Sequence, residues 1–97
     1  MDRRMVCVLV VHLPADGVES FQRYEEAVLP LLSDHHGRLD RRLRSADRRT
    51  EVHLVSFPSA EHFDSYRNDP RRAAQAHLLD EAHARIELYE VTDVACL

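Results

Sequence analysis

The sequence predicts an α+β fold with one antiparallel sheet of four strands and helices packed against one of its faces. Two features of the 97-residue chain indicate this. Four short segments have the apolar or alternating pattern of strands. The segment between the first and second strands, and the segment between the third and fourth, have the period of helices. The order of elements is therefore β-α-β-β-α-β, the split βαβ order.

The first strand is expected at residues 5–13 (MVCVLVVHL), which are almost entirely apolar at both parities. This pattern is typical of a central strand that is covered on both faces. Pro14-Ala15-Asp16-Gly17 ends the strand. Asp16 is expected to cap the next helix, with Glu19 at the capping-box spacing.

A helix is expected over residues 18–36. Pro30 lacks a backbone donor, so it should kink the helix or split it near Ala27. Gly37 is expected to end the helix. The inner stripe of this helix should consist of Phe21, Tyr24, Val28, Leu31, Leu32 and His35.

A β-hairpin is expected next. Residues 39–44 alternate, with Leu39 and Leu43 on one face and charged residues on the other, as in an edge strand. Residues 45–49 are polar and turn-like, and residues 51–57 (EVHLVSF) are expected to form the second strand of the hairpin.

The second helical region should begin at Ser59, an N-cap residue, with Phe63 and Tyr66 on its inner face. Asp69 and Pro70 should interrupt it and start a further helix, because Pro is favourable at the first helical position. The inner residues of that last helix are expected to be Ala73, Ala74, His77 and Leu78.

A final strand is expected at residues 85–94 (RIELYEVTDV), which completes a ferredoxin-like fold. We expect a single domain over residues 1–97, because 44% hydrophobic residues can build one core and no linker or repeat divides the chain. Cys7 and Cys96 are too few for a disulfide framework and are expected to be buried thiols.

Size and charge exclude several classes of function. The chain is too short for a TIM barrel or a full dinucleotide-binding fold. Seventeen acidic and thirteen basic residues, all of the latter arginine, give a net charge of −4, which argues against nucleic-acid binding. No segment reaches the roughly 20 apolar residues of a membrane span, and no clean signal-peptide cleavage site follows residues 1–11, so a cytoplasmic protein without a membrane partner is expected.

The apolar first strand also predicts a homodimer. Its valines occupy both parities, so the sheet face without helices should be apolar as well. Monomers seldom expose a contiguous apolar patch of that kind. We therefore expect an isologous dimer in which the two sheets pack face to face.

Two junctions resemble those of the dimeric α/β barrel superfamily. Leu29-Pro30-Leu31-Leu32 with His36-Gly37-Arg38-Leu39 resembles its first helix-to-strand junction, although His35-His36-Gly37 stands where a Gly-Gly pair is common. The junction from the third strand to the second helix is carried by Phe57-Pro58-Ser59, Phe63, Tyr66 and Asp69-Pro70. Together they resemble most an uncharacterised branch related to antibiotic-biosynthesis monooxygenases.

Three of the seven histidines are candidates for a pocket between the sheet and the helices. His12 closes the first strand, His53 lies in the middle of the third, and His77 lies on the stripe of the last helix. A sheet histidine and a helix histidine can converge there, so His53 and His77 are candidate catalytic residues. A neutral imidazole would suit general-base work near neutral pH. Each histidine could instead be a hydrogen-bonded structural residue.

Arg41 shares the expected inner face of Leu39 and Leu43, where it would need Glu51, Glu90 or an anionic ligand as a partner. It is the third candidate catalytic residue, as a group that holds a developing oxyanion. The alternative is protection of the sheet edge, with the guanidinium in water. The expected substrate-binding residues are His12, Tyr24 and Tyr66.

The superfamily resemblance implies two kinds of function. The first is a small cofactor-independent enzyme, of the oxygenase, cyclase or isomerase type, acting on an apolar or aromatic oxygenated molecule. The alternative is a non-catalytic dimer that binds a small ligand or serves in stress. The chain contains no metal-binding, phosphate-loop or nucleophile-elbow motif, so neither a metal nor another cofactor is expected. Haem degradation with His77 as axial ligand is less favoured, because the chain lacks Trp and its first strand lacks Asn.

Overall fold

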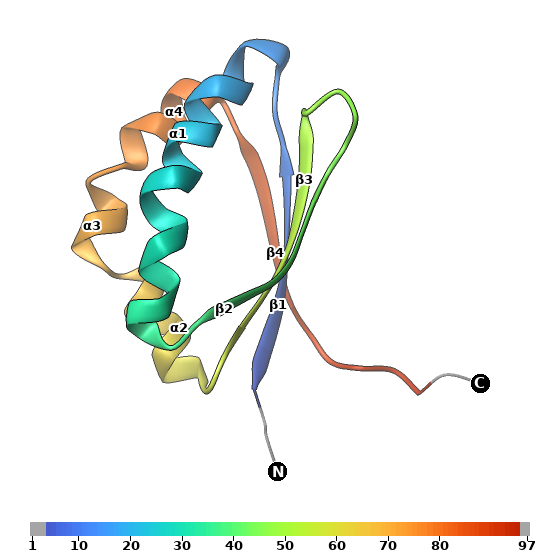
Figure 1. The fold of residues 1–97 in the computed structure, drawn as a ribbon, viewed down its shortest axis with the longest axis vertical. Coiled ribbons are helices and arrows are strands. Elements are labelled where there is room, and N and C mark those ends of the chain that lie inside the picture. Colours follow the sequence, from blue (N-terminus) through green and yellow to red (C-terminus); the bar gives the residue numbers. More distant parts are fainter. Residues whose placement is uncertain (1–3, 96–97) are drawn as a thin grey trace.

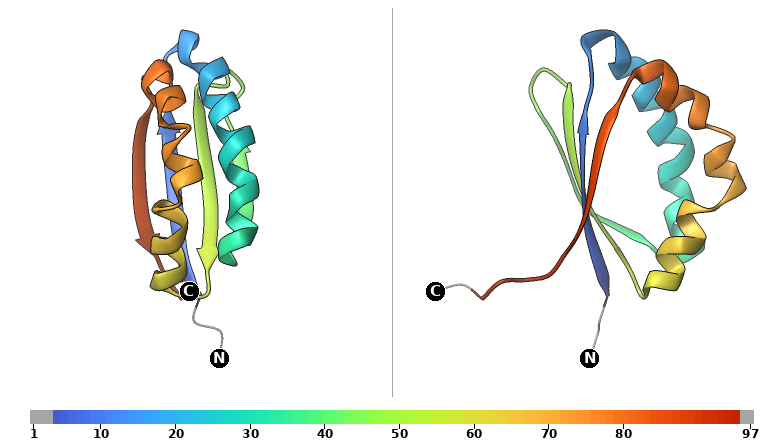
Figure 2. Two further views of the ribbon diagram at one scale, coloured as in Figure 1. Left: turned by 90° about the vertical axis from the view of Figure 1, so that its left-hand side faces the viewer. Right: turned by 180° about the vertical axis from the view of Figure 1, so that it is seen from behind.

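The computed structural model describes residues 4–95. Four antiparallel strands form one sheet in the order β2-β3-β1-β4, and the helices cover one of its faces (Figures 1 and 2). The expected α+β, ferredoxin-like fold is confirmed. The strands are β1 (Met5–His12), β2 (Arg38–Arg44), β3 (Thr50–Phe57) and β4 (Arg85–Val91). The helices are α1 (Val18–Val28), α2 (Ala60–Arg67), α3 (Pro70–Ala73) and α4 (Ala76–Ala82), with the 3₁₀ helices η1 (Ala15–Gly17) and η2 (Leu29–His35).

Strand β1 is central, as its two apolar faces predict. It pairs with β3 and β4, so that Leu9 lies opposite His53 on one side and opposite Leu88 on the other. Strand β2 is an edge strand, as expected. Cys7 in β1 is buried and unpaired, and burial raises the pKa of its thiol, with the charge of Glu90 as a smaller cause. Cys96 lies outside the described residues.

The first helix differs from its prediction at the start. Pro30 splits it as expected: α1 ends at Val28 and the chain continues as the 3₁₀ helix η2. Asp16 does not cap α1, because it lies inside η1 and the cap position falls on Gly17, which has no side chain to accept a hydrogen bond. A Cβ atom on Gly17 would collide with the carbonyl of Ala82, so a glycine lets the start of α1 meet the end of α4.

The turn from η2 to β2 contains Gly37 at a position with no room for a side chain. The left-handed residue is His36, with a φ of 59°, whereas Gly37 has no positive φ. Gly37 donates its N–H to the carbonyl of Leu32 over 2.8 Å. A Cβ on Gly37 would lie 2.6 Å from Cε1 of Phe57, so only glycine fits between η2 and β3.

The second helical region has the expected caps but a different inner stripe. Ser59 accepts from the N–H of His62, and Asp69 accepts from the N–H of Arg71. The chain leaves helical geometry between α3 and α4, and this changes the direction of the following side chains. Leu78 and Ala82 are buried, so the prediction holds for Leu78 and is wrong for the exposed residues Ala73, Ala74 and His77.

The sheet face opposite the helices is apolar at its centre. Strand register places there Val6, Val8 and Val10 of β1, Val52 and Leu54 of β3, and Leu43 and Tyr89 of the edge strands. Leu43 is 42% exposed and Tyr89 is 51% exposed. After β4 the chain extends away from the sheet on the side opposite the helices (Figure 1), and Val94 in this segment is 86% exposed. No helix within residues 4–95 is long and apolar enough to cross a membrane.

Candidate functional site

A cavity of about 270 Å³ lies between the sheet and the helices, where the sequence predicted a pocket. It is bordered by two core clusters, one around Phe21 and Val28 and the other around Phe57 and Tyr66. Most of its lining is apolar, from Leu9 in β1 to Leu88 in β4. The polar side chains that line it are Tyr24, Glu25, His53, Tyr66, Arg67 and Arg72.

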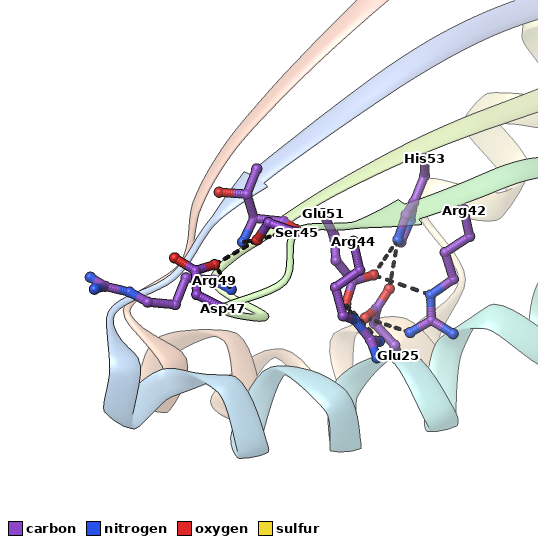
Figure 3. Close-up of polar contacts among 9 residues, drawn as sticks. Glu25, Arg42, Arg44, Ser45, Asp47, Arg49, Glu51 and His53 are labelled. Atoms are coloured by element: carbon purple, nitrogen blue, oxygen red, sulfur yellow. Dashed lines mark hydrogen bonds and ion pairs between the residues drawn. The ribbon is translucent and has the colours of Figure 1, made fainter.

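His53 reaches this cavity because of its place in β3. The alternation of that strand turns Glu51, His53 and Val55 toward the helices, while Val52 and Leu54 face the other way. Helix α1 covers this part of the sheet and places Glu25 against His53 (Figure 3). His53 and Glu25 are each only 2% exposed.

Five charged or titratable side chains form one cluster beside the cavity (Figure 3), in which Glu25, Glu51 and His53 are buried and the two arginines reach solvent. His53 Nε2 lies 2.8 Å from Glu51 Oε1 and 2.9 Å from Glu25 Oε2. Arg42 bridges the two carboxylates, with Nη2 at 2.9 Å from Glu25 Oε1 and Nε at 3.1 Å from Glu51 Oε1. Arg44 Nη2 lies 2.8 Å from Glu51 Oε2. We call these residues the β3 ionic cluster: Glu25, Arg42, Arg44, Glu51 and His53.

The electrostatics of the β3 ionic cluster favour charged forms. Burial acts to raise the pKa of Glu51, but hydrogen bonds from His53, Arg42 and Arg44 outweigh it and lower the pKa from 4.5 to about 2. Burial acts to lower the pKa of His53, but its hydrogen bonds to Glu25 and Glu51 outweigh this effect and raise it above 6.5. The two carboxylates therefore favour an imidazolium, whereas the sequence alone predicted a neutral imidazole.

The arginine on the inner face is Arg42, and the prediction for Arg41 is wrong. The ladder between β2 and β3 shifts register between Leu39 and Arg41, which reverses the parity of every later residue in β2. Arg42 then pairs with His53 on the inner face, and Arg41 pairs with Leu54 on the outer face. Glu51 was expected as a partner of Arg41, but in the structure it pairs with Arg42.

Two other candidate residues lie away from the cavity. His77 is exposed on α4 and is absent from the cavity lining, so the predicted convergence of His53 and His77 is wrong. The change of helix direction between α3 and α4 accounts for this. His12 lies on the sheet face opposite the helices, where its Nε2 is 3.1 Å from Glu87 Oε1, so it is not placed to bind a ligand in the cavity.

The two predicted tyrosines do line the cavity. The Tyr24 hydroxyl accepts a hydrogen bond from Arg72 Nη2 over 3.0 Å. The Tyr66 hydroxyl donates to the carbonyl of Val28 over 3.5 Å, and burial raises its pKa. The guanidinium of Arg72 lies over the Tyr66 ring, 4.5 Å from its centroid.

Glu25 and Arg72 were not predicted from the sequence. A signal for Glu25 exists, because it falls between Phe21 and Val28 at the spacing of the inner stripe of α1, where a carboxylate is unusual. No comparable signal exists for Arg72. It follows Arg71, and only the folded chain separates their roles: Arg71 pairs with Asp69 and Asp34, while Arg72 lines the cavity.

The β3 ionic cluster also contains the one group within residues 4–95 with metal-ligand geometry. Oxygen or nitrogen atoms of Glu25, Glu51 and His53 lie within 4.8 Å of one another. The guanidinium groups of Arg42 and Arg44 already contact the same carboxylates and neutralise them. This arrangement fits an internal ion-pair network better than a site for a divalent cation.

The sequence matches no family model and no curated protein. Solved structures do match. A candidate antibiotic biosynthesis monooxygenase from Bacteroides thetaiotaomicron superposes with a TM-score of 0.78 at 14% identity, over 95% of this chain and 90% of that one. A candidate antibiotic biosynthesis monooxygenase from Nitrosomonas europaea gives 0.73 at 13% identity, over 94% and 92%. SnoaB, a cofactor-independent oxygenase from Streptomyces nogalater, gives 0.69 at 14% identity, over 94% and 95%.

The chain has the fold of antibiotic biosynthesis monooxygenase-like proteins. The resemblance that two sequence junctions indicated is thereby confirmed for the fold. Within this monooxygenase-like fold, a buried imidazole and a buried carboxylate lie side by side in the wall of a mostly apolar cavity. A proton donor and a proton acceptor 2.9 Å apart in such a site can move protons on a bound molecule.

Proposed function

We propose that the chain is a small cofactor-independent enzyme that acts on an apolar, oxygen-bearing ring compound in the cavity between sheet and helices. The observation that carries this proposal is the placement of His53. Its imidazole lines an apolar cavity, and its Nε2 lies within 3 Å of two buried carboxylate oxygens. Perturbed titratable groups in a cavity of this kind are typical of catalytic sites.

The geometry divides the roles between two side chains. Nε2 of His53 is engaged by Glu25 and Glu51, and Nδ1 has no hydrogen-bond partner among residues 4–95. The imidazolium donates its Nδ1 proton to a carbonyl oxygen of the bound ring compound. Glu25 takes a proton from the neighbouring carbon, since Arg42 contacts its Oε1, whereas its Oε2 contacts only the imidazole of His53 in the described part of the chain. The carbonyl compound thereby becomes its enol.

An enol or enolate is an intermediate common to isomerisation, cyclisation and oxygenation. The likeness in fold to SnoaB, a cofactor-independent oxygenase, favours oxygenation among the three. Tyr24 and Tyr66 line the same cavity and would orient the substrate ring. Because His53 is buried among apolar side chains, the interaction between the imidazolium and the developing oxyanion is stronger than it would be in water.

The exchange of carbon-bound protons tests this proposal without knowledge of the natural substrate. We expect the protein to accelerate the exchange of the α-protons of 2-tetralone with D₂O, followed by ¹H NMR. The variants His53→Gln and Glu25→Gln should each slow this exchange by at least about 100-fold, the usual loss for a general acid or base. His77→Ala is the matched control, because His77 is exposed and lies outside the cavity. Exchange that is equally fast in His53→Gln would refute the proposed chemistry.

A ligand-binding protein without catalysis is the second candidate. It is favoured by the internal balance of the β3 ionic cluster, in which two arginines and one histidine already satisfy both carboxylates. Such a cluster can act as a structural element alone. In that case 2-tetralone would raise the melting temperature of the protein without any acceleration of proton exchange.

We also propose that the chain forms a homodimer through the sheet face opposite the helices. The valines at the centre of that face lack a cover within residues 4–95, and the exposed segment after β4 extends on the same side (Figure 2). A second copy would bury both features. The cavity lies on the other face of the sheet, so each subunit would keep its own site.

A further inference from the structure

Arg72 is held in the cavity by uncharged groups. Its Nη1 donates to the carbonyl of Arg67 over 3.2 Å, and its Nη2 donates to the hydroxyl of Tyr24 over 3.0 Å. Its guanidinium carbon lies over the Tyr66 ring, 4.5 Å from the centroid. The side chain is therefore fixed in direction, and it lines the cavity together with Tyr24 and Tyr66.

Within residues 4–95, no carboxylate lies within ion-pair distance of Arg72. The neighbouring Arg71 has two such partners, Asp34 and Asp69, and Arg42 and Arg44 share Glu25 and Glu51. The Nε atom of Arg72 is also buried without any hydrogen-bond partner. An unpaired buried donor on a charged group costs free energy, so we expect a hydrogen-bond acceptor to bind at this edge of the guanidinium.

The groups around that edge suit one anionic group. Nε and Nη2 form the side of a guanidinium that binds a carboxylate with two parallel hydrogen bonds. The hydroxyl of Tyr24 accepts from Arg72, and its own proton has no acceptor among the described residues, so it can donate to the same anion. Arg72 offers one such edge, which matches the two oxygens of a single carboxylate.

We propose that Arg72 is the specificity-determining residue of the cavity and binds the carboxylate of a small, planar, monoanionic aromatic acid. This inference rests on the proposed function, because it assigns the substrate class of the same cavity. The volume of about 270 Å³ corresponds to a ligand of about two fused rings. The carboxylate binds to Arg72, and the neutral oxygenated part of the ring faces His53.

Binding of two isosteric probes tests the assignment. We would titrate the wild-type protein with 2-naphthoate and with 2-naphthamide, which differ in charge but have nearly the same shape, and measure Kd by isothermal titration calorimetry. The wild type should bind 2-naphthoate at least about tenfold more tightly, as expected for a charge-assisted pair of hydrogen bonds. Arg72→Met should bind the two probes with equal affinity, and Arg72→Lys should keep part of the preference.

Arg67→Met is the matched control, because Arg67 also lines the cavity but stacks on Phe63. It should keep the preference for 2-naphthoate. A merely structural role of Arg72 would weaken both probes alike in Arg72→Met and would leave their ratio unchanged, which would overturn the proposal. Should Arg72→Met not fold, as judged by circular dichroism, the wild-type ratio and the ratio in Arg72→Lys decide the question.

The outcomes also separate this inference from the proposed catalysis. Equal binding of both probes by the wild type overturns the role of Arg72 and leaves the acid–base chemistry of His53 intact. A preference for 2-naphthoate without proton exchange on 2-tetralone supports the role of Arg72 and refutes the catalysis. Failure of both probes to bind overturns the cavity as a ligand site and this inference with it.

Discussion

Nε2 of His53 lies 2.8 Å from Oε1 of Glu51, two residues earlier on the same strand, and both side chains are almost fully buried. Residues two apart on a strand share one face, so the contact follows from the alternation of β3 alone. Glu25 and Arg42 join this pair from α1 and β2. The cluster thus connects three elements of the fold at the wall of the cavity.

Loss of Glu51 should be costly for stability. Glu51→Gln removes the buried negative charge that His53, Arg42 and Arg44 all contact, and it leaves the buried imidazolium of His53 without a full partner. We expect the free energy of unfolding, measured by urea denaturation, to fall by about 3 kcal/mol. Glu26→Gln, an exposed change on the adjacent helix, should alter it by less than about 0.5 kcal/mol. A loss no larger than that of the control would mean that the ion pairs contribute nothing net.

The same cluster predicts a maximum of stability in mildly acidic solution. The pKa of Glu51 is lowered by folding, so its contribution is present above about pH 4.5 and is lost as the pH falls toward 2. The pKa of His53 is raised by folding, so its contribution is present below pH 6.5 and is lost as the pH rises through its folded value. The groups that face His53 are Glu25 and Glu51, with Arg42 behind them.

The measurement is the melting temperature as a function of pH. The wild type should lose stability on both sides of the maximum. His53→Gln should flatten the alkaline side. It should weaken the acidic side without removing it, because Arg42 and Arg44 still lower the pKa of Glu51, and hydrogen bonds from Arg71 and His35 lower that of Asp69. An unchanged alkaline side in His53→Gln would show that His53 is not the group that titrates there.

The sequence predicted the order, type and approximate limits of the elements, because the apolar patterns and the turn residues agree with one another. The prediction failed in β2, where one extra residue reverses the face of the sheet on which each following side chain lies. The register shift at Asp40 exchanges the faces of Arg41 and Arg42, and no residue in this strand signals it, since neither glycine nor proline is present. His53 could be predicted as an inner residue of a strand, but its contact with Glu25 depends on how α1 packs on the sheet.

In the turn between η2 and β2, substitutions of the adjacent residues His36 and Gly37 should change the free energy of unfolding in opposite directions. Gly37→Ala places a Cβ 2.6 Å from Phe57, so we expect a loss of about 2 kcal/mol in the free energy of unfolding. His36→Gly relieves a left-handed backbone conformation, with a φ of 59°, and should increase it by about 0.5–1 kcal/mol. Chemical denaturation of both variants checks this. A gain in Gly37→Ala would mean that the close approach to Phe57 does not hold in solution.

The proposed dimer predicts that one charge on the uncovered sheet face produces a monomer. Val8 lies at the centre of that face, opposite Leu54 on β3 and Tyr89 on β4. Because two sheets packed face to face exclude water from this position, Val8→Glu would bury an unpaired carboxylate in each subunit. Light scattering after size-exclusion chromatography should give a dimeric mass for the wild type and a monomeric mass for Val8→Glu at micromolar concentrations.

The control for this change is Ala73→Glu, which adds the same charge at an exposed position on α3 and should leave the protein dimeric. A monomeric wild type would contradict the proposed interface. A dimeric Val8→Glu would place the contact elsewhere on the surface. Since Val8 and His53 face opposite sides of the sheet, the monomeric variant should still bind 2-naphthoate, which separates assembly from the cavity.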